Sequence, residues 1–256
     1  MRVLAPLITT TLLLTASAYA APVSVDSGAG GDLATIYEHC NRPGVFALTF
    51  DDGPFQYSWD LAQYLHSRGI KATFFVNGDN FVKNFAQATT ATAIDGTKSY
   101  MEVLKHYHDL GHEIASHTYG HVVLRGLSES EVEYQMNQQS DLIYSATGVR
   151  PALMRPPEGD LDETASRVVR RLGYSNILWD VDTKDYELHG LESEQNLVRE
   201  VVEADVSGQT PGHIALQHDV HESSAKELTP WLIDYIISKR YSFVTVSDCL
   251  GINAYQ

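Results

Sequence analysis

Short apolar runs alternate with longer amphipathic stretches along most of this chain, and each kind of segment predicts a different element. The short runs are typical of buried strands. The longer stretches carry apolar residues at helical spacing, and several begin with Ser or Asp followed by an acidic residue. The predicted strands are 45–50, 72–76, 113–116, 152–155, 175–179, 213–217 and 242–246, and the predicted helices are 58–68, 99–110, 128–147, 162–172, 193–206 and 225–240.

This alternation of strands and helices predicts an α/β fold in which helices cover a parallel sheet, either a barrel or a doubly wound sheet. Clusters of polar residues lie at the C-terminal ends of several predicted strands. A barrel gathers these ends around one mouth, whereas an open sheet spreads them along an edge. We therefore favour a barrel-like closure of about seven parallel strands.

The segment 1–20 is predicted to be a secretory signal peptide and not part of the fold. Arg2 supplies a positive start, an apolar stretch follows, and Ala18-Tyr19-Ala20 fits a small-x-small cleavage site. A membrane anchor is the alternative, but Pro6 and four threonines interrupt the stretch, which is shorter than the ~20 apolar residues of a span. We expect secretion to the extracellular space or the cell wall.

Residues 21–38 are predicted to be a flexible leader, because its first part is rich in Gly, Ser and Ala. Residues 39–256 are predicted to form one folded domain. The weakly periodic stretch 79–98 is expected to be an irregular insertion that either shapes access to the mouth or is simply solvated.

The chain carries a formal charge of −15, which becomes −16 when the predicted signal peptide is removed with its Arg2. An acidic surface is a poor match for nucleic acid or an anionic membrane, and it suits neutral or cationic partners. No later segment is long and apolar enough to span a bilayer. We expect a soluble monomer with no nucleic-acid or membrane partner.

Cys40 and Cys249 are the two cysteines of the chain, one near each end of the predicted domain. After export to an oxidising compartment they are expected to form one disulfide, with two free thiols as the alternative. Closing so long a loop is worth about 4–5 kcal/mol at most.

Four polar clusters follow predicted strands and hold residue types suited to hydrolysis. Two adjacent aspartates, two histidines four residues apart, an arginine and a further histidine can together build a metal-dependent site. The clusters are Thr49-Phe50-Asp51-Asp52-Gly53-Pro54, His117-Thr118-Tyr119-Gly120-His121, Arg155-Pro156-Pro157-Glu158-Gly159 and Leu216-Gln217-His218-Asp219.

His117 and His121 are the strongest candidate metal ligands. On a helical turn, their four-residue spacing places both imidazoles on one side, within reach of one cation. Asp51 or Asp52 can supply a third ligand and leave a position open for water. A coincidental pair is the alternative, since the chain has 11 histidines.

The adjacent aspartates are expected to take different roles, because successive side chains of an extended segment point apart. One can bind the metal while the other faces the substrate as general base. An ordinary Asp-Asp-Gly-Pro surface turn is the alternative. The strand that precedes the pair favours a site.

Arg155 precedes two prolines, so the next available backbone N–H belongs to Glu158. That N–H can stabilise an oxyanion, and the guanidinium can orient a nearby aspartate; a rigid surface loop is the alternative.

His218 can protonate a leaving group while a carboxylate from residues 179–186 holds its other ring nitrogen. A satisfied core histidine is the alternative. Five further histidines are given that structural interpretation, namely His106, His108, His112, His213 and His221.

Taken together, these motifs resemble the polysaccharide deacetylases of carbohydrate esterase family 4, which share the NodB homology domain, and look closest to secreted fungal chitin deacetylases. Their order is Thr-Phe-Asp-Asp-Gly-Pro, His-Thr-x-x-His, Arg-x-Pro, Asp-Thr-x-Asp-Tyr and Leu-x-His, over roughly residues 45–246. The resemblance implies a distorted (β/α) barrel that hydrolyses N-acetyl groups of chitin or chito-oligosaccharides. The site suits one divalent metal, Zn²⁺ or Co²⁺ first and Ni²⁺ in principle.

The resemblance also assigns roles to single residues. The implied roles are Asp51 as general base, Asp52, His117 and His121 as metal ligands, Arg155 as the residue that orients Asp51, His218 as general acid, Asp182 as the residue that tunes His218, and Leu216, Trp179 and Tyr186 as walls of the substrate pocket.

Glu158 departs from the family pattern, in which an aromatic residue usually follows the prolines. Its N–H can still serve the oxyanion. Its carboxylate leads to the hypothesis that the protein prefers a partly deacetylated, cationic sugar chain.

De-O-acetylation of xylan or another acetylated polysaccharide by the same site is the alternative activity. A non-catalytic, secreted carbohydrate-binding protein is the second alternative, although a chemically competent residue occupies every catalytic position. A zinc protease and a serine esterase lack support, because H-E-x-x-H and G-x-S-x-G are absent.

Overall fold

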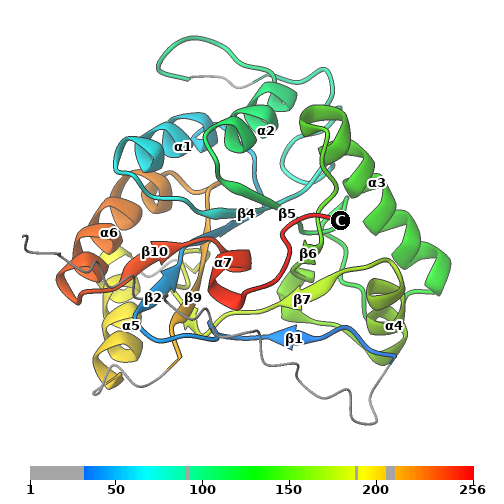
Figure 1. Cartoon of the computed structure of the whole chain (residues 1–256). Coiled ribbons are helices and arrows are strands. Elements are labelled where there is room, and N and C mark those ends of the chain that lie inside the picture. The colour runs from blue at the N-terminus through cyan, green and yellow to red at the C-terminus, as the bar shows by residue number, and fades with distance from the viewer. Residues whose placement is uncertain (1–31, 90–92, 188–189, 206–210) are drawn as a thin grey trace, which may run out of the picture.

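The computed structural model describes residues 32–89, 93–187, 190–205 and 211–256 of the chain. Strands lie at the centre, and α1 to α6 lie around them (Figure 1). The strands are β1 (Ile36–Tyr37), β2 (Val45–Ala47), β3 (Thr49–Asp51), β4 (Thr73–Val76), β5 (Glu113–Ser116), β6 (Leu153–Met154), β7 (Ser175–Ile177), β8 (Val181–Asp182), β9 (His213–His218) and β10 (Ser242–Val244). The helices are α1 (Ser58–Ser67), α2 (Tyr100–Asp109), α3 (Glu129–Thr147), α4 (Glu163–Arg171), α5 (Leu191–Ala204), α6 (Thr229–Ser238) and α7 (Val246–Leu250), with a 3₁₀ turn η1 (Pro157–Gly159) and a π-helical turn η2 (Ser224–Leu228).

The sheet is parallel throughout its named strands, which confirms the predicted α/β class. The strand order is β1-β7-β6-β5-β4-β3-β9-β2-β10, and β8 also pairs with β9. No ladder joins β7 to β8 in the described part of the chain, yet only residues 178–180 separate them. β7 pairs with β6 on one side of this gap, and β8 pairs with β9 on the other side. The strands therefore form a ring in which residues 178–180 of the chain, and not hydrogen bonds, connect β7 to β8. The arrangement is a barrel interrupted at this point.

The described residues form ten strands rather than about seven. The predicted strand 45–50 is divided at Leu48, although β2 and β3 keep one register against β9. Two further strands, β1 and β8, span only two residues each, which is too short to give a periodic signal. Helix α7 was also not predicted.

The predicted leader 21–38 is wrong at its C-terminal end. Ile36 of β1 pairs with Asn176 of β7, and the N–H of Ala34 donates to Ser166 Oγ at 3.0 Å, so this stretch belongs to the fold. The predicted signal peptide 1–20 and the leader up to residue 31 lie outside the described residues. Within the described ranges, no helix has the length and apolar character needed to cross a bilayer.

Helix starts follow the capping signals of the sequence. Ser99 and Ser128 each accept a hydrogen bond from the N–H of the glutamate three residues later, and that glutamate side chain accepts from the serine N–H. Asp162 accepts from the N–H of Ala165 in the same way at α4. The predictions for α2, α3 and α4 are therefore confirmed, with each predicted start at the capping residue.

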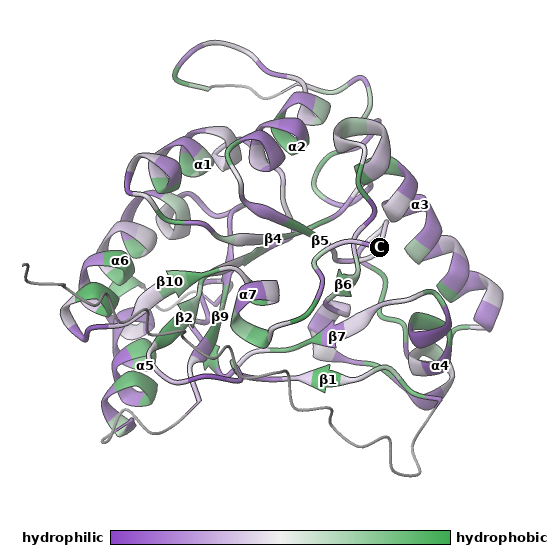
Figure 2. Cartoon of the chain, in the orientation of Figure 1, coloured by the Kyte–Doolittle hydropathy of each residue, from purple (hydrophilic) through white to green (hydrophobic). Residues whose placement is uncertain are grey.

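Alternation along the strands builds an inner and an outer apolar layer. Phe46, Leu48 and Phe50 pack outward with residues of the helices, whereas Val45 and Ala47 pack inside the ring of strands. The hydropathy colours agree, with apolar strands at the centre and mixed helices around them (Figure 2). The inner cluster consists of Cys40, Val45, Ala47, Phe75, Ala115, Leu153, Ile177, Ile214, Val246, Cys249 and Leu250.

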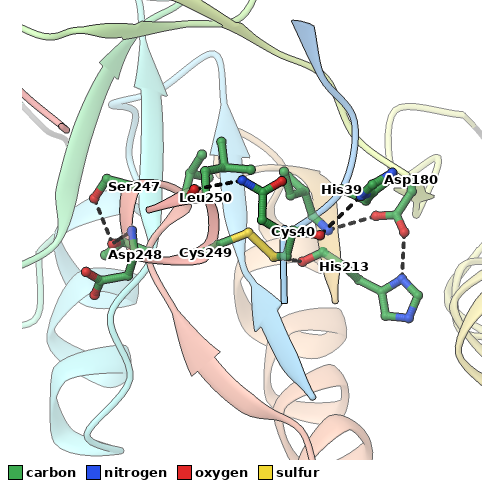
Figure 3. The surroundings of a disulfide bond; sticks show 12 residues. His39, Cys40, Asp180, His213, Ser247, Asp248, Cys249 and Leu250 are labelled. Carbon is green, nitrogen blue, oxygen red and sulfur yellow. Dashed lines mark hydrogen bonds and ion pairs between the residues drawn. A yellow bond between two sulfur atoms is a disulfide. The ribbon is translucent and has the colours of Figure 1, made fainter. Parts of the chain in front are cut away.

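The predicted disulfide between Cys40 and Cys249 is confirmed. It joins residues 209 apart in sequence and is buried in the inner cluster. Figure 3 shows it beside His213, the first residue of β9. The bond therefore lies toward the N-terminal ends of the strands, away from the polar strand ends described next.

Candidate active site

Polar side chains continue the inward-facing rows of the strands at their C-terminal ends. Asp51, His117, Arg155, Trp179 and His218 each stand an even number of residues beyond a member of the inner cluster in the same stretch of chain. Because side chains alternate with period two, all five turn toward the inside of the ring. A cavity of about 350 Å³ opens there, lined by Asp51, Asp52, His117, His121, Pro156, Glu158, Trp179, Tyr186, Leu216 and His218.

The three predicted metal ligands lie together in this cavity. Asp52 Oδ1 is 3.2 Å from His121 Nε2 and 3.6 Å from His117 Nε2. Across the described ranges, only one group of three His, Cys, Asp or Glu side chains has all its potential ligand atoms within 4.8 Å of one another, and it consists of Asp52, His117 and His121. Two imidazoles and one carboxylate are a donor set that suits Zn²⁺ or a similar cation.

The surroundings of His117 prepare it as a ligand. Its Nδ1 lies 2.8 Å from the carbonyl oxygen of Arg155, so Nδ1 carries the hydrogen and donates it, and Nε2 keeps a free lone pair. Burial lowers the pKa of His117, which favours the neutral imidazole that binds metals. These residues therefore fit a divalent cation.

The structural reason predicted for the histidine pair is wrong. Residues 117–121 form a loop after β5 and not a helical turn. Thr118 has a φ of 65° and His121 a φ of 51°, so two residues in the left-handed region fold the loop back on itself. The ring centroids of His117 and His121 consequently lie 5.0 Å apart.

The adjacent aspartates face different partners, as predicted, but not because both are extended. Asp51 ends β3, whereas Asp52 has a φ of 74°. This left-handed residue turns its carboxylate toward the histidines. Asn80 Nδ2 donates to Asp52 Oδ1 at 3.2 Å, a contact that no pattern in the sequence indicated.

Arg155 holds Asp51 in place. Its Nη1 donates to Asp51 Oδ1 at 2.7 Å and to Thr49 Oγ1 at 2.8 Å, and its side chain is fully buried. The carbonyl oxygens of Ile177 and Leu178 accept from Nε and Nη2, so the guanidinium is fixed on three sides. The other oxygen of Asp51 remains available to the cavity, 3.8 Å from His117 Nε2.

The residue that holds His218 is Asp185 and not the predicted Asp182. Asp185 Oδ1 lies 2.7 Å from His218 Nδ1, and Oδ2 accepts from the N–H of His218 at 2.7 Å. Asp182 instead accepts from the N–H of Lys184 and from Tyr186 Oη. Lys184 has a φ of 54°, and this reversal of the chain brings Asp185, three residues after Asp182, against the end of β9. The segment 179–186 was thus correctly predicted to supply the carboxylate.

The remaining predicted residues form the walls. Trp179, Tyr186, Leu216 and Glu158 all line the cavity. Tyr186 is half exposed and packs edge-on against His218, with ring centroids 5.4 Å apart. Glu158 has a φ of 58°, a left-handed conformation between Pro157 and Gly159. His221, which was given a structural interpretation, lies near the site, with its ring centroid 5.9 Å from that of His218.

The mouth of this interrupted parallel barrel holds a carboxylate–histidine–histidine group, an aspartate fixed by an arginine, and a histidine held by a buried aspartate. This arrangement is typical of barrel-type hydrolases with a candidate metal-binding site. A family model described as polysaccharide deacetylase matches residues 38–177. The chain belongs to this polysaccharide deacetylase family.

Individual relatives agree with the family match. The chain is 34% identical over 239 residues to a chitin deacetylase of Pestalotiopsis sp, covering 93% of this chain and 74% of that one. It is 35% identical over 215 residues to a chitin deacetylase of Colletotrichum lindemuthianum, covering 83% and 82%. The solved structure of the chitin deacetylase from that fungal pathogen superimposes with a TM-score of 0.77, at 35% identity, over 88% of this chain and 96% of that chain.

Proposed function

We propose that this protein hydrolyses N-acetyl groups of N-acetylglucosamine units in chitin or chito-oligosaccharides, releasing acetate and leaving glucosamine units. The observation that carries the proposal is the cavity in which the Asp52, His117 and His121 group faces both Asp51 and His218. The chitin deacetylases at 34% and 35% identity support the choice of substrate.

A divalent cation, Zn²⁺ or Co²⁺, held by Asp52, His117 and His121 would supply Lewis-acid polarisation and lower the pKa of a water molecule. Asp51 takes the proton of the attacking water with the oxygen that Arg155 leaves free. Arg155 fixes that carboxylate and places a permanent positive charge beside it, because an arginine does not lose its proton in proteins. The N–H of Glu158 contributes a hydrogen bond to the developing oxyanion.

His218 completes the reaction by protonating the departing amine. Asp185 holds Nδ1, which leaves the Nε2 hydrogen directed to the cavity. Leu216 supplies an apolar wall for the acetyl methyl group, and Trp179 and Tyr186 form walls for the sugar ring. The general acid and the general base therefore act from the ends of two strands that pair directly, since Asp51 is in register with His218.

Acetate release from defined chito-oligosaccharides, with and without a chelator, tests the proposal. We expect turnover that the chelator abolishes and that added Zn²⁺ or Co²⁺ restores. The Asp51→Asn variant should bind the metal but lose ~10²–10⁴-fold in rate, as expected for a general base. Full activity of that variant would contradict the role of Asp51. Release from acetylxylan but not from chitin oligomers would assign the site to O-acetyl groups instead, and no turnover with metal bound would favour a carbohydrate-binding protein.

Secretion through the segment 1–20 and a monomeric state are part of the same proposal. A chitin substrate lies outside the cell membrane, and an exported protein fits the disulfide between Cys40 and Cys249. N-terminal sequencing of the mature protein and its sedimentation behaviour test these two points.

A further inference from the structure

A buried carboxylate behind the turn of Asp52 takes no part in the steps above. Asp219 follows His218 directly and is fully buried. Its Oδ2 accepts hydrogen bonds from Ser58 Oγ at 2.5 Å and from Tyr107 Oη at 2.9 Å. Ser58 belongs to α1 and Tyr107 to α2, so this one carboxylate oxygen joins two helices to the end of β9.

The second oxygen of Asp219 lies against the backbone of Gly53. Within the described residues, Oδ1 has no hydrogen-bond partner, and a Cβ added to Gly53 would stand 2.2 Å from it. Only glycine therefore fits between Asp52 and Pro54. The carboxylate closes one side of the turn at the residue that follows the metal-binding aspartate.

The turn that follows β3 needs this support because Asp52 is in the left-handed region, which is unfavourable for a residue with a side chain. The N–H of Asn77 donates to the carbonyl of Gly53 at 3.0 Å, and the N–H of Phe55 donates to Ser58 Oγ at 2.7 Å. Ser58 Oγ in turn donates a hydrogen bond to Asp219, so the turn is connected to Asp219 through Ser58. The carboxylate of Asp219 therefore ties the turn to α1, α2 and the end of β9, and the N–H of Asn77 ties it to the end of β4.

We propose that Asp219 is a positioning residue that holds Asp52 in its metal-binding conformation. Because Asp219 also follows His218, it fixes the distance between the metal carboxylate and the general acid. Asp219 is not among the residues that line the cavity, so it is not a catalytic residue. The inference rests on the proposed metal site but is independent of which acetylated polysaccharide is the substrate.

The test is the affinity of the metal-free protein for Zn²⁺ alone, measured by calorimetry. Asp219→Ala should weaken Zn²⁺ binding ~10–100-fold, as removal of a support behind a metal ligand typically does. Asp219→Asn keeps the shape and one acceptor oxygen for Ser58 and Tyr107, so it should recover most of the affinity. Tyr107→Phe removes a single hydrogen bond and should give an intermediate value. In steady-state assays kcat should fall while KM stays nearly constant, because the pocket walls are unchanged.

Glu113→Ala is the matched control. Glu113 is also buried and accepts hydrogen bonds from Thr73 Oγ1 and the N–H of Ser247. However, it lies at the N-terminal start of β5, whereas the proposed metal site lies at the C-terminal ends of the strands. This variant should lower the unfolding temperature and leave the Zn²⁺ affinity unchanged.

Equal weakening of Zn²⁺ binding by Asp219→Ala and Glu113→Ala would overturn the proposal, because the effect would then be general destabilisation. Wild-type affinity in folded Asp219→Ala would overturn it as well. If Asp219→Ala does not fold, wild-type affinity in Tyr107→Phe decides against the proposal. Unchanged binding in Asp52→Ala would defeat the metal site on which it rests, whatever the substrate.

Discussion

His218 owes its acid character to its neighbours. Burial lowers the pKa of an imidazole, but here the hydrogen bond and charge of Asp185, helped by the charges of Asp51 and Asp52, raise the pKa of His218 to about 9. Only the protonated ring can donate a proton to the departing amine. The proposed general acid is therefore protonated at neutral pH and loses its proton as the pH rises through about 9.

The Asp185→Asn variant should move this loss of activity to lower pH. An amide keeps the shape but carries no charge, so the pKa of His218 should fall toward its ordinary value of about 6.5. We expect the alkaline limb of the kcat/KM profile for acetate release to shift down accordingly, with ~10-fold or greater loss of rate at pH 8. Asp182→Asn is the control and should leave that limb in place. If Asp182→Asn shifted the alkaline limb and Asp185→Asn did not, Asp182 would be the residue that tunes His218, as the family resemblance implied.

Glu158→Gln tests the hypothesis of a preference for cationic chains. The carboxylate lines the cavity and is exposed, so it can attract a glucosamine unit next to the acetylated one. The variant should lose a few-fold in kcat/KM on partly deacetylated oligomers at low salt, and should be unchanged on fully acetylated ones. Glu163→Gln, an exposed acid on α4, serves as the control. The hypothesis would be contradicted if the ratio of kcat/KM on partly deacetylated oligomers to kcat/KM on fully acetylated oligomers were the same in wild type and Glu158→Gln.

For single residues, the sequence predicted which residues belong to the site better than it predicted their hydrogen-bond partners. Asp51, Asp52 and Arg155 follow strands whose apolar runs are plain in the sequence. The choice between Asp182 and Asp185 depends on one positive φ at Lys184, which no residue type at that position indicates. The contact of Asn80 with Asp52 joins residues 28 apart, with α1 and β4 between them, and has no local signal in the sequence.

Among the elements, those with strong local signals were predicted well and those held by tertiary contacts were not. Helices α2, α3 and α4 begin at capping residues that act through their own first turns. In contrast, β1 and β8 are strands only because β7 and β9 lie beside them. The loop 117–121 brings its histidines together through backbone conformation rather than through helical spacing.

The turn η1 holds the Glu158 N–H, which is proposed to bind the oxyanion, and it also packs against the cavity wall at Trp179. Gly159 makes both possible. Gly159 has a φ of 70°, and a Cβ there would lie 3.1 Å from Trp179 Cη2. Any side chain at this position would strain the backbone and displace either the Glu158 N–H or the Trp179 wall.

Gly159→Ala should therefore lower kcat/KM for chitin oligomers ~10-fold or more, because small displacements of positioned groups are costly. The Zn²⁺ affinity should be unchanged, since none of the three proposed metal ligands belongs to this turn. Gly126→Ala is the matched control, because Gly126 has a similar φ of 81° but open space around it. It should lose stability and keep its activity. If both variants lose activity equally, the contact with Trp179 is not the cause.

Over the whole molecule, the site and the disulfide occupy opposite ends of one barrel. The five steps of β9 from His213 to His218 span about 16 Å at ~3.3 Å per residue. Cys40 and Cys249 pack with Val45 and Ile214 near the starts of the strands. The proposed metal ligands lie beyond the C-terminal ends of the strands. Within the described residues, β7 and β8 are joined by residues 178–180 of the chain and not by a hydrogen-bonded ladder. Covalent bonds therefore hold the barrel together at two places, at this connection and at the disulfide.

Replacement of both cysteines by alanine should separate stability from activity. The bond closes a loop across 209 positions, and its loss should lower the free energy of unfolding by about 2–5 kcal/mol, which urea denaturation measures. At 25 °C the folded variant should keep its Zn²⁺ affinity and kcat within about twofold, because the rigid strands between the two ends preserve the mouth. Wild-type protein treated with reductant should behave in the same way. A loss of Zn²⁺ affinity in the folded double variant would contradict this, since it would show that the closure at the N-terminal end controls the geometry of Asp52, His117 and His121.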